Sequence, residues 1–329
     1  MNAFQYKDAA NAEAAISASG AQPGGKFVAG GTTLIDLMKL EVETPRVLVD
    51  INRLPLTQLE TTSDGGMRID AMVRNSDLAN QELIKQRYPV LSQALLSGAS
   101  PQLRNMATTG GNLLQRTRCY YFRDVAYAAC NKRNPGSGCA AMDGYNRIHA
   151  ILGTSDHCIA TNPSDMAVAM MALQAVVHTQ GAKGNRDIPL NQFYRLPGNT
   201  PHIETVLEPN ELITYVTLPA LPEGTRSYYL KLRDRASYEF ALSSAAVVLQ
   251  VSGGNIQNAQ IALGGVGTIP WRSREAEQAL QGKAANEETF KNAAQAAMAN
   301  ARPLHDNAFK VKLAQLCLRR ALRVATQQS

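Results

Sequence analysis

The chain has 329 residues, of which 45% are hydrophobic and 18% are charged, and its formal net charge is +6. This composition is typical of a soluble globular protein with a sizeable core. No apolar run is long enough to span a membrane, and the first residues, MNAFQYKD, lack the basic and apolar regions and the twin-arginine pair of an export signal. The positive charge would suit nucleic-acid binding, but no Lys/Arg run is present, so a mildly basic enzyme surface or subunit interface explains it better.

Residues 1–55 have the pattern of a βαβ unit. The pattern predicts a strand at 27–28, a helix with Leu34, Leu37, Met38 and Val42 on one face, and a closing strand at 47–51. The loop between the first strand and the helix reads Ala29-Gly30-Gly31-Thr32-Thr33. Glycines there let backbone N–H groups approach a diphosphate, and the threonine hydroxyls add donors near the helix N-terminus. Alone, such a loop is more often a plain turn, and it is not the G-x-G-x-x-G of a Rossmann fold.

Residues 56–222 are predicted to form a second, mixed region. The periodicity predicts strands at 67–73, 175–178 and 212–216, and helices after residue 77, at 90–96 and at 165–173. Asn75-Ser76-Asp77 has the composition of a helix cap, and Leu78, Leu83 and Ile84 are the apolar positions of that helix. A second glycine–threonine loop, Ala107-Thr108-Thr109-Gly110-Gly111-Asn112, precedes a long irregular segment from Gln115 to Thr161. A loop of that length in a compact domain usually has a function.

The segment Pro219-Ala-Leu-Pro-Glu-Gly224 is the best candidate for a linker to the last region, residues 223–329. Apolar strands at 245–251 and 256–263 flank Ser252-Gly253-Gly254-Asn255, which has the composition of a hairpin turn. Helices are predicted at 274–281, 287–301 and 306–325. The order of elements predicts an α+β protein of three units, 1–55, 56–222 and 223–329, with an insert at about 115–161.

The irregular segment contains four of the five cysteines, Cys119, Cys130, Cys139 and Cys158. Thiolates are preferred ligands of iron and zinc centres. The spacings, C-x10-C, C-x8-C and C-x18-C, are too open for a zinc knuckle, which uses close pairs, but they suit a cubane, whose corners are further apart. A [4Fe–4S] cluster is therefore the favoured interpretation. Two disulfides, a zinc site or four unrelated thiols remain as alternatives.

The charge of this insert agrees with a cluster. Its six basic residues outnumber three aspartates, and nearby cations would stabilise the negative charge of a thiolate-bound cluster. The basic residues are Arg116, Arg118, Arg123, Lys132, Arg133 and Arg147. The fifth cysteine, Cys317, lies in a helical pattern near the end of the chain and is predicted to be a buried small hydrophobe that ligates nothing.

Together these residues resemble a known family. The segments that carry the resemblance are Phe27 to Leu34, Leu103 to Asn112, Ser164-Asp165, Tyr229-Leu230-Lys231 and Ile261 to Gly267. They resemble the FAD-binding subunit of the molybdenum hydroxylases, the xanthine oxidase family, over essentially the whole chain. The cysteine insert departs from the common form and is similar to the branch whose flavin subunit carries an extra [4Fe–4S] cluster, as in the bacterial periplasmic aldehyde oxidoreductases. Flavin subunits of hydroxybenzoyl-CoA reductases also have a cysteine loop, so the resemblance specifies the fold more closely than the substrate class.

The resemblance implies a fold and a set of site residues. The fold is the two-subdomain FAD-binding fold of the PCMH/vanillyl-alcohol-oxidase type, followed by a C-terminal α+β domain like that of CO dehydrogenase flavoproteins. Asp165 is expected at the ribityl or diphosphate region of the cofactor and Lys231 near the flavin ring. The remaining FAD contacts are expected from Lys26, Phe27, Val28, Ala29, Gly30, Gly31, Thr32, Thr33, Leu34, Ala107, Thr108, Gly111 and Asn112, and the cluster ligands are Cys119, Cys130, Cys139 and Cys158.

The resemblance also implies partners. The chain has neither a molybdopterin signature nor a plant-type C-x4-C-x2-C run, so aldehyde oxidation and the [2Fe–2S] centres are expected on a molybdenum-cofactor subunit and a [2Fe–2S] subunit. The expected function is electron transfer through FAD and [4Fe–4S] in a heterotrimeric aldehyde oxidoreductase. The flavin subunit of a hydroxybenzoyl-CoA reductase or xanthine dehydrogenase is the alternative, and a nucleic-acid-binding Fe–S protein is the alternative of another class. Residence in the periplasm would require co-export with a signal-bearing partner; without one the chain is expected in the cytoplasm.

Overall fold

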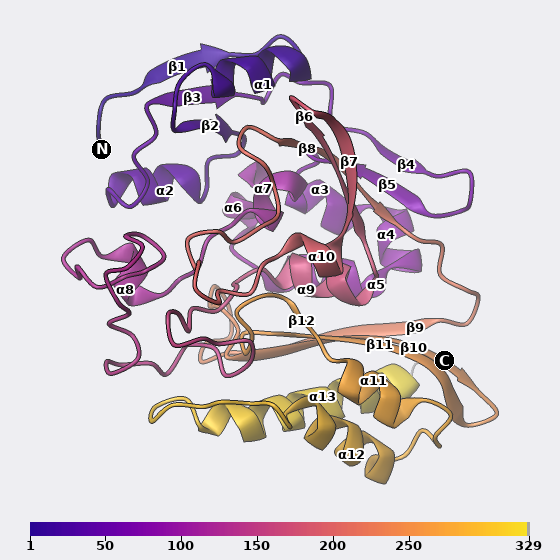
Figure 1. Ribbon diagram of the computed structural model, residues 1–329. Coiled ribbons are helices and arrows are strands. Elements are labelled where there is room, and N and C mark those ends of the chain that lie inside the picture. Colours follow the sequence, from indigo (N-terminus) through magenta and orange to yellow (C-terminus); the bar gives the residue numbers. More distant parts are fainter. Residues whose placement is uncertain (328–329) are drawn as a thin grey trace.

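The computed structural model describes residues 1–327, which form three sheets with helices between and around them (Figure 1). The N-terminal sheet is parallel, with strand order β1-β3-β2, and the two helices of this unit connect its strands. Its elements are β1 (Gln5–Asp8), α1 (Ala12–Gly20), β2 (Gly25–Val28), α2 (Leu34–Lys39) and β3 (Val47–Asp50). The predicted βαβ pattern is thus present, and it is preceded by a strand and a helix that the sequence pattern did not indicate.

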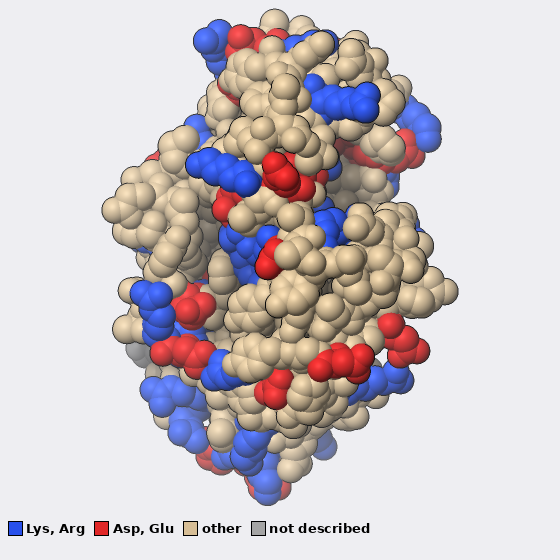
Figure 2. Space-filling view, turned by 90° about the vertical axis from the view of Figure 1, so that its left-hand side faces the viewer, with Lys and Arg blue, Asp and Glu red and all other residues tan. Residues whose placement is uncertain are grey.

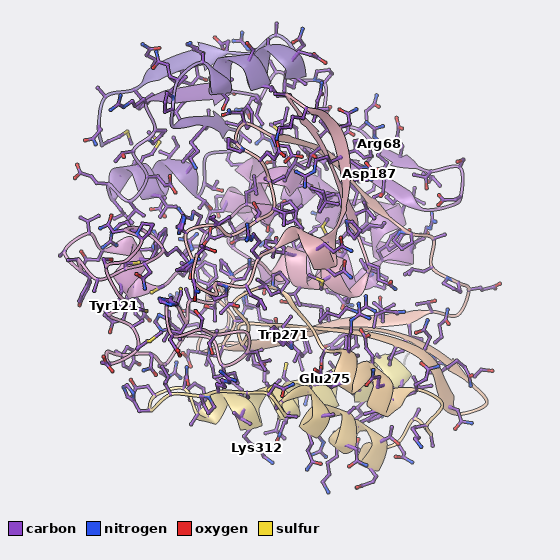
Figure 3. The ribbon with its side chains drawn as sticks, viewed as in Figure 1. Arg68, Tyr121, Asp187, Trp271, Glu275 and Lys312 are labelled. Atoms are coloured by element: carbon purple, nitrogen blue, oxygen red, sulfur yellow. The ribbon has the colours of Figure 1, made fainter. Side chains whose placement is uncertain are left out.

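The central sheet is antiparallel, with order β4-β5-β8-β6-β7. Its strands are β4 (Leu59–Thr61), β5 (Met67–Asp70), β6 (Val176–Gly181), β7 (Gly184–Pro189) and β8 (Leu212–Leu218). The helices of this unit are α3 (Asn75–Asn80), α4 (Glu82–Arg87), α5 (Pro89–Ser97), α6 (Pro101–Met106), α7 (Thr109–Leu113), α9 (Asp165–Ala172) and α10 (Leu190–Phe193). Figure 3 shows Arg68 and Asp187 on the strands of this sheet.

The prediction of one helix capped by Asn75-Ser76-Asp77 was wrong in its detail. Arg74, not an Asn or Asp side chain, occupies the N-cap, and it provides no side-chain hydrogen bond. The segment forms two short helices, α3 and α4, separated at Gln81, and Leu83 is exposed. The apolar spacing fitted a continuous helix, but the extended backbone of Gln81 (ψ 128°) interrupts it.

The C-terminal sheet lies between two layers of helices, as Figure 1 shows. Its order is β12-β11-β10-β9, with β9 (Arg226–Leu232), β10 (Ser243–Ser252), β11 (Asn255–Gly264) and β12 (Trp271–Arg272). Along β10, Ala245 and Val247 face the helices α11 (Arg274–Leu280), α12 (Glu287–Ala297) and α13 (Phe309–Gln327), whereas Ala246 and Val248 face the core of the central unit. Side chains of a strand alternate between its faces, so burial on both faces explains the continuous apolar run.

Two predictions about this unit are confirmed. The turn between β10 and β11 has Gly253 and Gly254 at φ 55° and 78°, the left-handed conformations that a two-residue hairpin turn requires. Cys317 is fully buried in the core between the sheet and α13. Over residues 1–327, no helix has both the length and the apolar character needed to cross a membrane.

The insert between Gln115 and Thr161 contains one short helix, α8 (Tyr120–Arg123), and is otherwise irregular. In Figure 1 it lies beside α2 and above the C-terminal helices. Its last part is attached to the C-terminal unit, because the N–H groups of Ile151 and Leu152 both donate to the carbonyl of Val266. The insert therefore bridges the first unit and the last.

Candidate cofactor sites

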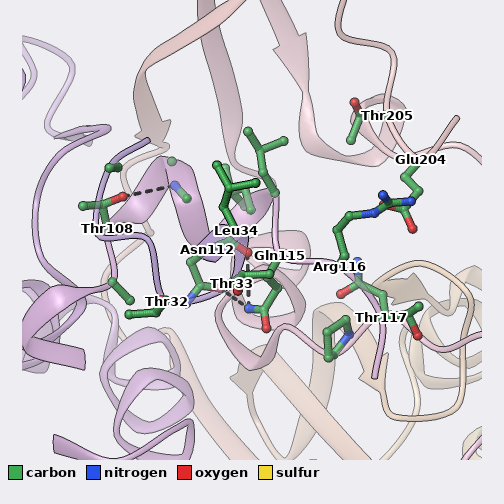
Figure 4. Close-up of a pocket in the computed structure, with 18 of the residues that line it drawn as sticks. Thr32, Thr33, Leu34, Thr108, Asn112, Gln115, Arg116, Thr117, Glu204 and Thr205 are labelled. Atoms are coloured by element: carbon green, nitrogen blue, oxygen red, sulfur yellow. Dashed lines mark hydrogen bonds and ion pairs between the residues drawn. The ribbon is translucent and has the colours of Figure 1, made fainter. Parts of the chain in front are cut away.

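A cavity of about 780 Å³ is lined by residues of all three units. Figure 4 shows part of its wall, where Thr32 and Thr33 lie near Thr108 and Asn112. All fifteen residues that the sequence predicts for FAD line this cavity: Lys26, Phe27, Val28, Ala29, Gly30, Gly31, Thr32, Thr33, Leu34, Ala107, Thr108, Gly111, Asn112, Asp165 and Lys231. Cys158 and Lys132 of the insert line it as well. One cavity thus brings together two glycine loops and a cysteine that are far apart in the sequence.

The first glycine loop presents unused donors. The backbone N–H groups of Gly30, Gly31, Thr32 and Thr33 have no hydrogen-bond acceptor within the described part of the chain. The Thr33 hydroxyl does not cap α2 either. Consecutive N–H groups without an internal acceptor need an outside one, and an anion is the acceptor that such a cluster of donors suits best. The donor set therefore fits a diphosphate.

The two positions of this loop require glycine for different structural reasons. A Cβ on Gly30 would lie 1.9 Å from the carbonyl oxygen of Met106, so the loop passes directly against the backbone that leads into the second loop. Gly31 has φ +69°, a conformation that side chains disfavour. The first glycine thus allows two loops to touch, and the second allows the chain to turn.

The second glycine loop differs from the first, because its N–H groups are already bonded. Thr109 N donates to Val73 O, Gly110 N to Ala71 O, and Gly111 N to the Thr108 hydroxyl. A Cβ on Gly110 would lie 3.1 Å from that of Ala71. This loop is therefore a tight packing element that presents side chains, such as Asn112, to the cavity rather than free backbone donors.

Asp165 and Lys231 form a buried ion pair at the cavity wall. Lys231 Nζ lies 2.7 Å from Asp165 Oδ2 and also donates to the carbonyl of Ser97 at 3.1 Å. The hydroxyl of Tyr229 donates to Asp165 Oδ1 at 2.5 Å. Burial, followed by the charge of Asp165, raises the pKa of Tyr229 well above its ordinary value, so this phenol stays a donor. The pair joins α9 to β9.

The four insert cysteines gather in one apolar cluster. Cys119, Cys130 and Cys158 are buried and Cys139 is partly buried, and all four belong to one packed group that also contains Leu37 of α2. Cys130 and Cys139 face each other across an antiparallel bridge. All five cysteines of the chain are free, so the disulfide alternative is not what the structure shows.

Burial controls the ionisation of these thiols. It raises the pKa of Cys119 to about 12, although the N–H groups of Phe122 and Tyr121 act to lower it. It also raises the pKa of Cys139 and Cys158, against the N–H of Ala141 at the former and the charge of Lys132 at the latter. A metal centre would have to displace the protons, and it would then receive thiolates that already face N–H donors.

A single metal ion and a cubane cluster place different requirements on the four cysteines. Across residues 1–327, no three His, Cys, Asp or Glu side chains converge closely enough to hold a single metal ion. A cubane does not require such convergence, because each cysteine binds a different iron and the sulfurs surround a volume. Free, buried thiols with backbone N–H groups directed at them fit that requirement, so the residues are compatible with a cluster but not with a single zinc ion.

The basic residues of the insert form ion pairs and hydrogen bonds within the protein. Arg116 pairs with Glu43 and, at 2.8 Å, with Glu204. Arg118 and Arg123 both pair with Asp36. Lys132 pairs with Glu204 and Arg147 pairs with Asp234, each at 2.6 Å. Arg133 donates to backbone carbonyls, among them that of Tyr121. Carboxylates pair with most of these cations, and the expectation that the cations stabilise the charge of a bound cluster stays a prediction. Lys132 also acts on a sulfur, because its charge lowers the pKa of Cys158 against the effect of burial.

These ion pairs explain the modest basicity of the surface. Figure 2, which looks onto the insert side of the molecule, shows Lys and Arg interspersed with Asp and Glu rather than gathered in a stripe. The pairs also fasten the insert to the segment that follows the first glycine loop, since Asp36 is in α2 and Glu43 lies just beyond it.

His149 is a residue of this site that was not predicted from the sequence. This residue is buried, and its Nε2 lies 3.1 Å from Cys119 Sγ. Burial and the charge of Lys310 lower its pKa to about 4, so the ring is neutral. No motif in the sequence marks it, because its distance to Cys119 depends on how the insert folds back. The acidic partners Asp36, Glu43 and Glu204 were missed for the same reason.

Two protein families match consecutive parts of the chain. Residues 2–221 match the family described as the FAD binding domain in molybdopterin dehydrogenase. Residues 227–325 match the CO dehydrogenase flavoprotein C-terminal domain. The chain is 53% identical, over the full length of both proteins, to the aldehyde oxidoreductase FAD-binding subunit PaoB of Escherichia coli K12. It is 27% identical to the glyceraldehyde dehydrogenase medium chain of Sulfolobus acidocaldarius, over 92% of this chain and 90% of that one.

Solved structures give the same result. The fold matches a carbon monoxide dehydrogenase structure from Hydrogenophaga pseudoflava with a TM-score of 0.78 and 28% identity, covering 99% of this chain and 98% of that chain. It matches the reconstituted CO dehydrogenase from Oligotropha carboxidovorans with a TM-score of 0.79 and 25% identity, covering 100% and 99%. The expected fold, an FAD-binding part followed by a flavoprotein C-terminal domain, is confirmed. The chain belongs to the family of FAD-binding subunits of the molybdenum hydroxylases.

Proposed function

We propose that this chain is the electron-transfer subunit of a molybdenum-dependent aldehyde oxidoreductase, and that it carries FAD and a [4Fe–4S] cluster. The observation that carries the proposal is the single cavity whose wall contains both the free N–H groups of Gly30 to Thr33 and the insert residue Cys158. Aldehyde as the substrate class follows from the relative at 53% identity, which is an aldehyde oxidoreductase subunit.

For FAD, we propose that the first loop holds the diphosphate. The N–H groups of Gly30, Gly31, Thr32 and Thr33 and the threonine hydroxyls would replace the water that solvates its charge. Asn112 and the Asp165–Lys231 pair lie on other parts of the same wall and would contact the rest of the cofactor. Bound FAD would supply the capacity to accept electrons and store them in pairs, and the protein would supply position and shielding from water.

For the cluster, we propose Cys119, Cys130, Cys139 and Cys158 as its ligands. Three features support this assignment: the four thiols are free, they share one apolar environment, and N–H groups face several of the sulfurs. Leu37 of α2 packs against the same group, and Cys158 lines the cavity. The cluster would therefore sit directly behind the wall of the FAD cavity, which suits electron exchange between the two cofactors.

The partners follow from the division of labour in the family. We propose that a molybdenum-cofactor subunit oxidises the aldehyde with water to a carboxylate, and that a [2Fe–2S] subunit conducts the two released electrons to this chain.

The test is the cofactor content of the complex purified with both partners. We expect one FAD, and four iron and four sulfide beyond those of the [2Fe–2S] subunit, per copy of this chain. Anaerobic addition of an aldehyde should then bleach the flavin absorption. Flavin without the additional iron would disprove the cluster but leave the flavin assignment intact. A flavin that an aldehyde fails to reduce, in a complex that retains its molybdenum, would disprove the electron-transfer role.

We further propose that the complex reaches the periplasm by co-export. A buried cluster is best assembled in the reducing cytosol, and the folded chain would then be carried by a partner that has a twin-arginine signal. Fractionation of cells that express this chain with and without its [2Fe–2S] partner tests the idea. Periplasmic accumulation of the chain alone would contradict co-export, and retention of the whole complex in the cytoplasm would identify a cytosolic enzyme.

A further inference from the structure

His149 is the side chain beside the cysteine group that the proposed ligand set leaves unexplained. It is 1% exposed, and its Nε2 lies 3.1 Å from Cys119 Sγ. The imidazole ring lies 6.2 Å, centre to centre, from the ring of Tyr121, which Figure 3 shows in the insert. Burial of a polar ring among apolar neighbours is unfavourable unless the ring is hydrogen-bonded, so the contact with the sulfur requires an explanation.

The position of His149 is fixed from the C-terminal unit. Lys310 of α13 is fully buried, and its Nζ donates to the carbonyls of Ile148, His149 and Gly265 at 2.9, 3.0 and 2.7 Å. The N–H of His149 donates to the carbonyl of Asn146 at 3.0 Å. The backbone around His149 is thus held in place by the C-terminal unit, which fixes the position from which the buried ring extends toward Cys119.

The hydrogen-bond pattern identifies the ring nitrogen that carries the proton. His149 Nδ1 is buried and has no partner among the described residues, whereas Nε2 faces the sulfur. A thiolate ligand can only accept, so a ring nitrogen that hydrogen-bonds to it must carry the proton, which places N–H at Nε2. The proton then lies in the one hydrogen bond that the ring makes, and Nδ1 retains a lone pair, which is less costly to bury than an unpaired N–H.

We propose that His149 is a positioning residue of the cluster site, donating a hydrogen bond from Nε2 to Cys119 Sγ that raises the reduction potential of the bound cluster. The inference rests on the proposed function, because it presupposes the cluster. Reduction adds negative charge to the cluster and its sulfurs, so a donor at a sulfur stabilises the reduced state more than the oxidised one. The neighbouring N–H groups of Tyr121 and Phe122 act on the same sulfur, and His149 adds a side-chain donor to them.

The test compares two variants in the complete complex. His149→Leu removes the donor, whereas His149→Gln retains an N–H at similar reach. The control is His157→Leu, since His157 lies in the same insert but is exposed. The readouts are iron and sulfide content and the midpoint potential of the cluster, measured by EPR during a redox titration, and neither depends on turnover.

We expect all three variants to retain iron. In His149→Leu the reduction equilibrium should shift about tenfold toward the oxidised cluster, which is about 59 mV for a one-electron couple. The His149→Gln and His157→Leu variants should stay close to the wild type. Equal potentials in the wild type and His149→Leu, or in His149→Leu and His149→Gln, would overturn the proposal.

Loss of the cluster in a His149 variant would also test the proposal. If His149→Leu loses iron and His149→Gln retains it at the wild-type potential, the need for a donor is supported. If both variants lose iron equally, the ring acts only through its shape and the proposal fails. A wild-type complex without the additional iron and sulfide would refute the proposed cluster itself, which is a separate result from any difference between the variants.

Discussion

Lys231 and Asp165 join the C-terminal sheet to the central unit through a buried ion pair whose charged atoms lie 2.7 Å apart. Their side chains are 3% and 8% exposed, so water does little to screen either charge. Lys231 belongs to β9 and Asp165 begins α9, on opposite sides of the junction between the two units. The pair therefore contributes both to the wall of the cavity and to the orientation of the units that form it.

We expect Lys231→Met to destabilise the protein strongly, because it leaves the Asp165 carboxylate buried without its cation. The loss of one partner from a buried pair typically costs about 3–5 kcal/mol. Adding Asp165→Asn should recover much of that loss, since the amide oxygen still accepts from Tyr229. Thermal unfolding with FAD in excess measures both variants. A double variant no more stable than Lys231→Met would show that the charges do not interact as the geometry indicates.

The FAD assignment is best tested at the threonines. We expect Thr32→Val and Thr33→Val, combined, to weaken FAD binding at least tenfold while the fold is kept, because a hydrogen bond to a charged group contributes about 1.5–3 kcal/mol. The measurement is FAD retained per chain after gel filtration, followed by titration with added FAD. Thr61→Val, at an exposed position of β4, is the matched control. A full flavin complement in the double variant would refute this role of the loop.

Changing the glycines would be less informative. Gly31 has φ +69°, and a Cβ there would lie 3.0 Å from Ile35 Cγ1, so Gly31→Val strains the loop whether or not FAD binds beside it. In Gly30→Ala the added atom would collide with the carbonyl of Met106. Both variants would lose FAD for a conformational reason and would not identify the diphosphate site.

The cluster assignment predicts a difference among the five cysteines. We expect each single change to Ser at Cys119, Cys130, Cys139 or Cys158 to abolish or alter the EPR signal of the reduced cluster. Cys317→Ala should leave the signal unchanged and lower stability slightly, because it removes one buried sulfur from the C-terminal core. Iron analysis and EPR of the reduced complex measure both effects. A signal lost at Cys317 and kept at any of the four would overturn the ligand set.

The lowered pKa of Glu204 predicts how the stability of the protein depends on pH. Burial by itself raises the pKa of this carboxyl, but Lys132 and Arg116 outweigh it, so its pKa lies below the ordinary value of 4.5. A folded-state pKa below the unfolded one gives a stability contribution that is fully present above pH 4.5 and is lost as the pH falls through the folded-state value. We therefore expect the wild type to lose stability below pH 4.5 relative to Glu204→Gln.

Unfolding curves at a series of pH values measure that difference. The Glu204→Gln variant should be less stable at pH 7, where Lys132 loses its anionic partner and Arg116 loses one of two. The two curves should converge in acid, where Glu204 is protonated. Glu223→Gln, at an exposed carboxyl, should run parallel to the wild type throughout. A constant gap between wild type and Glu204→Gln across the acid range would contradict the assigned ion pair.

Local patterns determined much of what the sequence predicted. The helix at 165–172 and the hairpin at 252–255 were predictable, because a cap, a turn and an apolar period lie within a few residues of one another. The break at Gln81 and the strand β1 were not, because neither has a distinctive period. Among the cofactor residues, the two glycine loops and the four thiols were visible because each is a distinctive residue type in a short span or an unusual loop.

Only the tertiary structure decided what those residues contact. Arg116 pairs with Glu43, 73 residues away in the sequence, and Arg118 pairs with Asp36, 82 residues away. His149 contacts Cys119, 30 residues away. The two glycine loops have similar sequences, yet one keeps its N–H groups free, while in the other Thr109 and Gly110 donate to the turn at 71–73 that follows β5. The sequence by itself determined which groups that could hold a cofactor are present. Their availability depends on long-range packing, because a carboxylate or carbonyl brought close by the fold competes with any ligand for the same charge or donor.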